Sequence, residues 1–477
     1  MESSTGFRYA ELADTLEAQI RAGSFRTGEK LPSIRGLHLQ TGLSISTVYQ
    51  ALIELEKRGM VEARKKSGYY VKPQLQGLLP PPRTSATLRG PQKVNINDLA
   101  FALIEAMGDP EILQFGGALI HSDLMPPKEL STIIRTAPLR LLKDGMAAYE
   151  HYLGHPELRR QIAKRMAPLC GPVSFDDMVI TNGCIEAVAL SLKAVTRSGD
   201  TVLVESPTFP WFLQLIEDLN LRALEIPTDP QEGIDLAVLQ RALRKHAVRA
   251  AIFVANFHNP LGFLMSDEKK QAVVALLNAR NIPIIEDDIY GELYFDASRP
   301  MPLKAFDRKG LVLYCASFSK SLAPGLRVGW VMPGQFLDRI KRYRLNQHIS
   351  APGLTHWALG RYLQTANYDR HLRRLRTQLK NQVSSTALAI ARCFPPDTKI
   401  TAPRGGVVLW VQLNEKVDSL ELFRTALERR IAVFPGIICA NSDTYRNYIR
   451  INCGMPYTDA IDRGIQTLAG IVAEMSH

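Results

Sequence analysis

The stretch SFSKSLAPGLRVGW at residues 317–330 decides the fold of most of this chain. It places Lys320 beside Ser317 and Ser319 and seven residues before Arg327, on a segment rich in small residues. Hydroxyl groups and a guanidinium fork neutralise a phosphate dianion, and a lysine amine can condense with an aldehyde. The stretch therefore predicts a phosphate cradle beside a reactive amine. The alternative is a lysine exposed on a loop rich in glycine and proline.

A phosphate cradle beside an amine suits pyridoxal 5'-phosphate (PLP), which Lys320 would hold as a Schiff base. Over its full length the stretch also resembles the cofactor-lysine motif of the fold-type I aminotransferases. The chain around it fits an α/β domain, because short β-branched runs alternate with helical stretches from about residue 110 onward. The runs are MVIT, TVLVE, AAIFVANF, PIIED, LVLYCASFS and VGWVM. Their order indicates a mainly parallel sheet.

Ligands of such sheets collect at the carboxyl ends of the strands, so site residues are expected after each run. After MVIT, the segment TNGCIEA can present backbone N–H groups of Gly183, Cys184 and Ile185 to a phosphate at a helix start. The run PIIEDDIY carries three adjacent acids. Because side chains alternate along a strand, Glu286 and Asp288 should point away from the side that Asp287 faces.

The aminotransferase resemblance implies roles for further residues. Phe209 in SPTFPWF would stack on the cofactor ring, and Asn259 in HNPLG would bind its phenolic oxygen. The Asp-x-x-Tyr spacing implies that Asp287 pairs with the pyridine nitrogen and that Tyr290 binds the phenolic oxygen, with Asp288 as the alternative acid.

Two more segments extend the resemblance beyond the parallel sheet. In YEHYLGHPELR, the spacing selects Tyr149 as a side chain that reaches a partner subunit's cofactor phosphate. In NYIRINC, Arg450 would grip the carboxylate of an amino acid as a bidentate pair. The expected domain covers residues 96–477, with a large part at about 110–345 and a smaller α+β part at about 346–477.

The N-terminal 72 residues have a different pattern. Leu12, Leu16 and Ile20 recur at helical spacing, and the helix should stop near Gly23. Ser33 is expected to cap a short second helix that ends at Gly42, and a third helix should open at Ser44. The continuation GMVEARKKSGYYV predicts a β-hairpin with a basic tip. Residues 1–72 therefore predict a winged helix-turn-helix.

Through LPSIR, the SxSTV run and the KKSGYYV hairpin, this segment resembles the DNA-binding domain of the GntR regulators. The resemblance implies that two sets of residues bind double-stranded operator DNA. Backbone contacts would come from Arg35, Arg64, Lys65 and Lys66. Contacts in the major groove would come from Ser44, Ser46, Thr47 and Tyr49. The alternative is a helix cap beside a solvated turn.

Composition limits the remaining possibilities. The 477 residues carry a net charge of +11 and a pI near 9.3, which permits a polyanionic partner. The six cysteines are scattered, so neither a disulfide framework nor a metal site is indicated. No apolar run is long enough to span a membrane, and we expect the protein to stay in the cytoplasm. Residues 73–95, with a proline triplet, predict a semi-extended linker that tethers the DNA-binding domain without fixing it.

A GntR-like winged helix joined to an aminotransferase-like domain resembles the MocR-type regulators. The resemblance implies a PLP-binding transcription factor that forms a head-to-tail homodimer and responds to an amine, an amino acid or PLP itself. One alternative is a working aminotransferase that carries a DNA-binding domain, since all the expected cofactor residues are present. A scaffold without cofactor is the second alternative.

Overall fold

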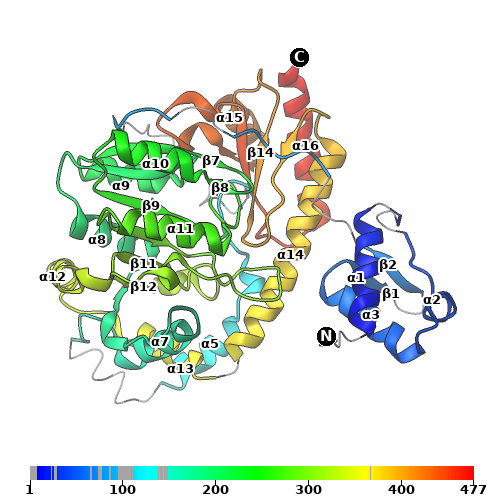
Figure 1. The fold of residues 1–477 in the computed structure, drawn as a ribbon, viewed down its shortest axis with the longest axis horizontal. Coiled ribbons are helices and arrows are strands. Elements are labelled where there is room, and N and C mark those ends of the chain that lie inside the picture. The colour runs from blue at the N-terminus through cyan, green and yellow to red at the C-terminus, as the bar shows by residue number, and fades with distance from the viewer. Residues whose placement is uncertain are drawn as a thin grey trace, which may run out of the picture. The chain divides into compact units, whose positions relative to one another are not determined.

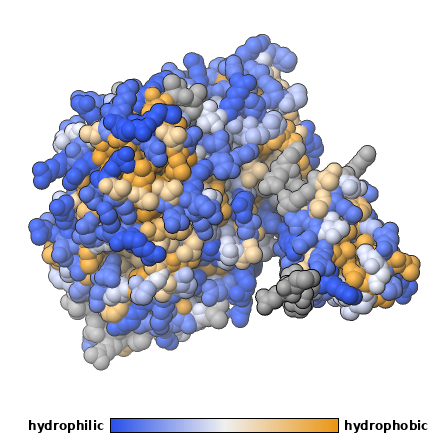
Figure 2. Space-filling model, in the orientation of Figure 1, coloured by the Kyte–Doolittle hydropathy of each residue, from blue (hydrophilic) through white to orange (hydrophobic). Residues whose placement is uncertain are grey.

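The structure, a computed structural model, describes residues 8–22, 24–25, 29–64, 67–72, 78–84, 88–94, 109, 111–137, 139, 143, 149–365 and 367–477. The chain divides into two compact units, Met1–Leu78 and Leu79–His477 (Figure 1). Among the described residues, no helix combines the length and the apolar character needed to cross a membrane. Hydrophilic residues cover most of the face in Figure 2, with apolar residues in scattered patches.

The first unit is a three-helix core followed by a hairpin. Its elements are α1 (Arg8–Arg21), α2 (Ile34–Thr41), α3 (Ile45–Lys57), β1 (Val61–Arg64) and β2 (Gly68–Val71). Ser33 and Ser44 cap α2 and α3 by accepting hydrogen bonds from the backbone N–H groups of Gly36 and Thr47. Gly42 ends α2 with a φ of 68°, a left-handed conformation that suits glycine. The predicted helices, caps and hairpin are therefore confirmed.

Burial explains why these elements assemble. The inward stripe of α3, formed by Val48, Leu52 and Leu55, is fully buried against Leu16 of α1. Arg58, at the end of α3, contacts carboxylates on both helices, at 3.0 Å from Glu17 and 3.3 Å from Glu54. The apolar stripe and this charged cluster together hold α1 against α3.

The second unit is built on a sheet with the strand order β3-β7-β6-β9-β10-β11-β12-β5, with β8 paired to β7. Strands β7, β6, β9, β10 and β11 are parallel, and β12 and β5 are antiparallel to their neighbours. The strands are β3 (Gln92–Lys93), β5 (Val179–Thr181), β6 (Thr201–Ser206), β7 (Arg222–Asp229), β8 (Gly233–Ile234), β9 (Ala250–Phe253), β10 (Ile284–Asp287), β11 (Val312–Ser317) and β12 (Gly329–Met332). The expectation of a mainly parallel sheet is confirmed.

Helices surround this sheet (Figure 1). They are α5 (Pro127–Arg135), α7 (Pro156–Cys170), α8 (Cys184–Val195), α9 (Pro210–Asp218), α10 (Leu236–Lys245), α11 (Asp267–Asn278), α12 (Leu337–Gln347) and α13 (Gly353–Leu363). Helix α8 packs on β10, β11 and β12, and α10 packs on β7 beside α11. Helices on both faces bury the strands, which explains why their sequences are apolar almost throughout.

The smaller part contains an antiparallel sheet in the order β13-β14-β17-β16. Its elements are α14 (Asn367–Cys393), β13 (Lys399–Ile400), β14 (Val408–Gln412), α15 (Ser419–Glu428), β15 (Ile431–Ala432), β16 (Phe434–Pro435), β17 (Tyr448–Asn452) and α16 (Asp459–Ser476). Long α14 lies beside α16 in Figure 1 and contacts it.

Two boundaries differ from the sequence expectation. Strand β4 (Leu113–Gln114) pairs with β15, and the backbone N–H of Asn452 donates to the carbonyl oxygen of Phe115 at 2.9 Å. Residues 113–115 therefore join the smaller part, although the sequence assigned them to the large one. Their short apolar run does not reveal which sheet they enter, because either could bury it.

The expected linker is also bound over part of its length. The backbone N–H of Arg83 donates to the side chain of Gln412 at 2.8 Å, and the Thr84 hydroxyl donates to Asp229 at 2.6 Å. Strand β3 pairs with β7. Residues 83–84 and β3 thus contact the rest of the second unit, because an extended segment leaves backbone and side-chain polar groups free to form hydrogen bonds.

Candidate functional site

A cavity of about 230 Å³ lies at the carboxyl ends of the parallel strands, where the sequence pattern placed the site. Its walls come from the start of α8 and from the segments that follow β6, β9, β10 and β11. The predicted residues that line it are Cys184, Ile185, Phe209, Asn259, Asp287, Tyr290, Ser319, Lys320, Arg327 and Arg450. Segments far apart in the sequence thus meet at one place.

Lys320 follows β11 and presents its amine to this cavity. Its Nζ donates a hydrogen bond to the carbonyl oxygen of Ala118 at 2.6 Å. Burial, together with the charges of Arg450 and Arg327, lowers the pKa of Lys320 to about 8, although the charge of Asp287 opposes the shift. The amine is therefore neutral far more often near neutral pH than an ordinary lysine, as a nucleophile must be.

Asp287 ends β10 with its carboxylate toward α8. The Cys184 thiol donates to Asp287 Oδ1 at 3.2 Å, and the backbone N–H of Ile289 donates to the same oxygen at 3.0 Å. Burial raises the pKa of Asp287 to about 6, and these two hydrogen bonds limit the rise. A buried carboxylate that accepts few hydrogen bonds from the protein can pair with a cationic partner.

The neighbouring acids, Glu286 and Asp288, point away from the side that Asp287 faces, as the alternation of side chains along the strand predicts. Glu286 accepts hydrogen bonds from the backbone N–H groups of Leu303 and Lys304. Asp288 accepts from Asn256, Tyr314 and Arg299. Both oxygens of Asp288 are therefore occupied by protein donors, which leaves Asp287 as the acid that lines the cavity.

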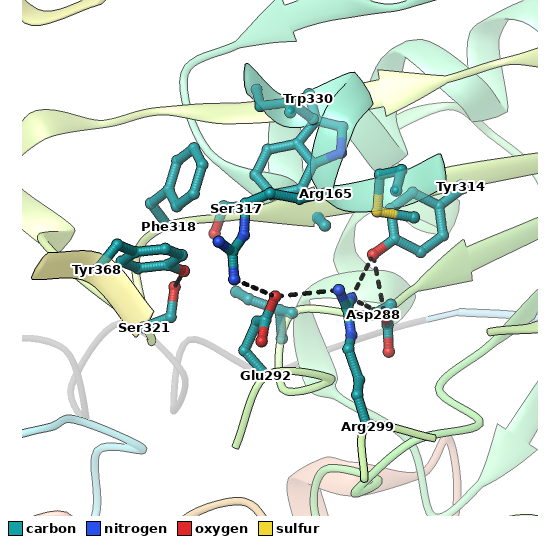
Figure 3. A pocket seen from close by; sticks show the side chains of 14 residues that line it. Arg165, Asp288, Glu292, Arg299, Tyr314, Ser317, Phe318, Ser321, Trp330 and Tyr368 are labelled. Carbon is teal, nitrogen blue, oxygen red and sulfur yellow. Dashed lines mark hydrogen bonds and ion pairs between the residues drawn. The ribbon is translucent and has the colours of Figure 1, made fainter. Parts of the chain in front are cut away.

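Asp288 belongs to a buried charge network around a smaller cavity of about 20 Å³ (Figure 3). Glu292 lies at its centre, 3.0 Å from Arg299 and 2.9 Å from Arg376. Burial pushes the pKa of Glu292 up, but Arg299, Arg165 and Arg376 outweigh that effect and hold it below its ordinary value. The network ties the loop after β10 to α14, because Arg376 lies on that helix.

Arg450 on β17 enters the main cavity from the smaller part. Its guanidinium is fully buried, donates to Asn259 Oδ1 at 2.8 Å and lies 3.6 Å from the centre of the Phe434 ring. Its Nε has no hydrogen-bond partner among the residues that the structure describes. Asn259 in turn donates to the hydroxyl of Tyr290 at 3.3 Å. A buried cation with a free donor fits an anionic ligand.

Residues that the sequence assigned to a phosphate cradle lie together around Arg327. Its guanidinium donates to the carbonyl oxygen of Asn182 at 2.9 Å and lies 3.5 Å from the Ser319 hydroxyl. Gly183 has a φ of 99°, and a Cβ added there would clash with the Arg327 guanidinium. Gly183 therefore lies against the Arg327 guanidinium, and it is not among the residues that line the cavity.

Two more predicted residues lie away from the cavity around Lys320. Ser317 lines the smaller one, because the alternation of β11 directs it there. The Tyr149 side chain is 84% exposed and takes no part in the cavity of its own chain. Such exposure is compatible with the expected reach to a partner subunit.

Sequence reasoning missed several residues at the cavity. The carbonyl oxygens of Gly116 and Ala118 accept from Arg450 and Lys320, and Trp211 and Phe434 form part of the wall. Trp211 lies only two residues after Phe209, so the same motif could have identified it. Carbonyl groups and a Phe on a separate strand give no comparable signal.

The expected DNA-contact residues lie on the surface of the first unit. The Ser44 hydroxyl lies 2.8 Å from both the Ser46 and the Thr47 hydroxyls, and Arg35 and Tyr49 are exposed. Arg64 pairs with Glu62 at 2.8 Å and lies over the ring of Tyr70. Lys65 and Lys66 lie outside the described residues.

Comparison with known proteins identifies both units. Residues 8–71 match the bacterial regulatory proteins of the gntR family, and residues 124–468 match aminotransferase class I and II. The HTH-type transcriptional regulator YdcR of Escherichia coli is 38% identical, covering 98% of this chain and 99% of its own. This chain belongs to the MocR-type GntR regulators. A second regulator from the same organism, YjiR, is 36% identical to this MocR-type chain over 98% of both.

Solved structures resemble the larger unit of this MocR-type regulator. A kynurenine aminotransferase from Pyrococcus horikoshii matches 80% of this chain and 95% of its own, with a TM-score of 0.73 and 26% identity. The α-aminoadipate aminotransferase LysN from Thermus thermophilus matches 80% and 96%, with a TM-score of 0.74 and 25% identity. The larger unit therefore has the fold-type I aminotransferase fold. The protein is a transcriptional regulator in which this fold is joined to a GntR domain.

Proposed function

We propose that this MocR-type regulator binds PLP in the cavity around Lys320 and alters its DNA binding when a small amine or amino acid enters the same cavity. The observation that carries the proposal is the buried amine of Lys320, whose pKa is lowered to about 8, in one cavity with Asp287 and Arg327. When bound, PLP would supply an aldehyde to that amine and an electron-withdrawing ring.

The residues present fit this cofactor. Asp287 would hold a protonated ring nitrogen, and Asn259 and Tyr290, which already contact each other, would bind the phenolic oxygen. Arg327 and Ser319 would bind the phosphate beside the start of α8, where free N–H groups favour an anion. Phe209 lines the same cavity and would contact the ring face.

Arg450 is the proposed anchor for an effector carboxylate. Its guanidinium is buried in the cavity, and its Nε lacks a partner within the described part of the chain, so an incoming carboxylate would bind this donor. The terminal nitrogens of Arg450 already donate to the carbonyl oxygen of Gly116 and to Asn259 Oδ1, so a carboxylate bound there would compete with these two contacts. Effector binding would thereby disturb contacts between the large and smaller parts.

The DNA partner is proposed to be a double-stranded operator bound by residues 1–72. The Ser44, Ser46 and Thr47 cluster at the start of α3 would face the major groove, and Arg35 would contact the backbone. We expect the regulator to act in the cytoplasm, where its operator is found.

A head-to-tail homodimer is the proposed assembly. The Ser350 hydroxyl donates to the carbonyl oxygen of Glu150 at 3.0 Å, so the segments that carry Tyr149 and Ile349, which are exposed by 84% and 68%, are neighbours. Exposed apolar side chains grouped in this way favour a protein interface. Light scattering of the purified protein tests the dimer, and a monomer at micromolar concentration would contradict it.

A functioning aminotransferase is the second candidate, because Lys320, Asp287 and Arg450 converge as transamination requires. Multiple turnovers with an amino acid and a keto acid would favour that candidate. A response confined to ligand binding and DNA affinity would favour the regulator that only senses its ligand.

The decisive experiment follows the visible spectrum of the purified protein. We expect a yellow protein in which borohydride reduction fixes the cofactor on Lys320, as peptide mapping would show. Lys320→Ala should lose that covalent link while operator binding by residues 1–72 persists. Cofactor fixed on another lysine would contradict the proposal.

A further inference from the structure

Apart from Arg450, the side chains of the cavity wall that have no assigned role in cofactor binding are apolar. Leu119, Trp211 and Phe434 line the cavity together with the residues assigned above. Phe209 and Trp211 are half-buried and stacked, with ring centroids 5.1 Å apart and planes inclined by 21°. Half-buried aromatic faces at a cavity leave apolar area that a ligand can cover.

The charged side chains of the described wall are already committed. They are Asp287, Lys320, Arg327 and Arg450. Under the proposed function the first three hold the cofactor, and Arg450 takes the α-carboxylate of the ligand. A further carboxylate or ammonium group on the ligand would therefore enter the cavity without a charged partner from the described wall. Burial of such a group without a partner is strongly unfavourable.

The polar side chains of the wall are also paired among themselves. Asn259 contacts Tyr290 at 3.3 Å and Arg450 at 2.8 Å, and Ser319 lies 3.5 Å from Arg327. An uncharged polar side chain on the ligand would have to compete for these groups. An apolar side chain would instead cover the aromatic wall without breaking any of these hydrogen bonds.

We propose that the effector is an α-amino acid with an apolar side chain, and that Trp211 is the residue that recognises that side chain. Arg450 fixes the carboxylate, and Trp211, which is stacked beside Phe209, receives the apolar group. This inference rests on the proposed function, because it concerns a ligand of the same cavity.

The test uses the absorption spectrum of the protein loaded with PLP as the readout of binding. L-leucine and L-asparagine have side chains of nearly equal shape, so their comparison isolates polarity. We expect L-leucine to perturb the spectrum at a concentration at least about tenfold lower than L-asparagine. L-aspartate and L-lysine should bind more weakly still.

Variants of Trp211 test the assigned residue. Trp211→Ala should weaken L-leucine about tenfold and L-alanine less than about twofold, because only the larger side chain reaches the aromatic wall. Trp211→Phe keeps an aromatic surface and should restore most of the preference. The spectrum of each variant without amino acid shows whether the cofactor site is intact.

The outcomes separate the two proposals. L-asparagine, L-aspartate or L-lysine binding as tightly as L-leucine would overturn the apolar effector, and so would equal losses for L-leucine and L-alanine in Trp211→Ala. If the protein is yellow but its spectrum responds to no amino acid, the apolar effector is overturned and the proposal of PLP binding stands. A protein that takes up no PLP overturns the proposed function itself. The comparison of L-leucine with L-asparagine needs no variant, so a misfolded Trp211→Ala leaves the test intact.

Discussion

Attachment of PLP to the cofactor-free protein should accelerate from pH 7 to about pH 8 and then level off. Only the neutral amine attacks an aldehyde, and burial with the charge of Arg450 lowers the pKa of Lys320 from 10.5 to about 8. The neutral fraction then rises about fivefold between pH 7 and pH 8 and at most about twofold above that. An amine of ordinary pKa would instead gain about tenfold per pH unit over the whole range.

The assay measures the rate at which PLP becomes fixed to the protein on borohydride quenching, with Lys320→Ala subtracting attachment to surface lysines. Nα-acetyl-lysine serves as the control amine, because its pKa is unperturbed. Arg450→Gln should move the midpoint to higher pH, since it removes a charge that lowers the pKa of Lys320. Asp287→Asn should move it to lower pH for the opposite reason.

Two results would refute this reasoning. A rate for the protein that keeps climbing in parallel with Nα-acetyl-lysine up to pH 10 would show that Lys320 titrates as an ordinary lysine. Midpoints that stay fixed in Arg450→Gln and Asp287→Asn would show that these charges do not act on the amine. The first result would also remove the main observation behind the proposed cofactor site.

Three further predictions concern stability, DNA binding and coupling. Glu292→Gln should destabilise the larger unit by about 3 kcal/mol in urea unfolding, because it leaves buried arginines without their carboxylate. The matched change in an exposed pair, Asp296→Asn beside Arg404, should cost less than about 1 kcal/mol, and equal costs would contradict the network. Operator affinity should fall steeply with salt, and Thr47→Ala should alter sequence preference more than the salt slope. A fragment that starts at residue 79 should not bind the operator, and full binding by it would exclude the winged helix as the DNA reader. Typical coupling would let the effector change operator affinity by roughly 5- to 150-fold. Operator DNA must then change effector affinity by the same factor. Titration calorimetry in both directions checks this equality.

The sequence determined the two-domain organisation and most of the cavity. Local signals sufficed for the helix caps at Ser33 and Ser44, the parallel strands and the motifs that carry Asp287, Lys320 and Arg327, because each depends on neighbours within a few residues. The alternation of side chains along β10 also predicted correctly that Asp288 faces away from Asp287. Period-two geometry follows from the strand backbone alone.

Only the tertiary structure decided which distant segments complete the site. Residues 113–115 join the smaller part, the carbonyl oxygen of Ala118 meets Lys320, and Phe434 lies under Arg450. The charge network of Glu292 likewise joins residues from α7, the loop after β10 and α14. Backbone carbonyl groups are the same at every residue, and an apolar run can be buried against more than one surface. Their partners are therefore fixed by the packing of the whole domain, which no local pattern in the sequence records.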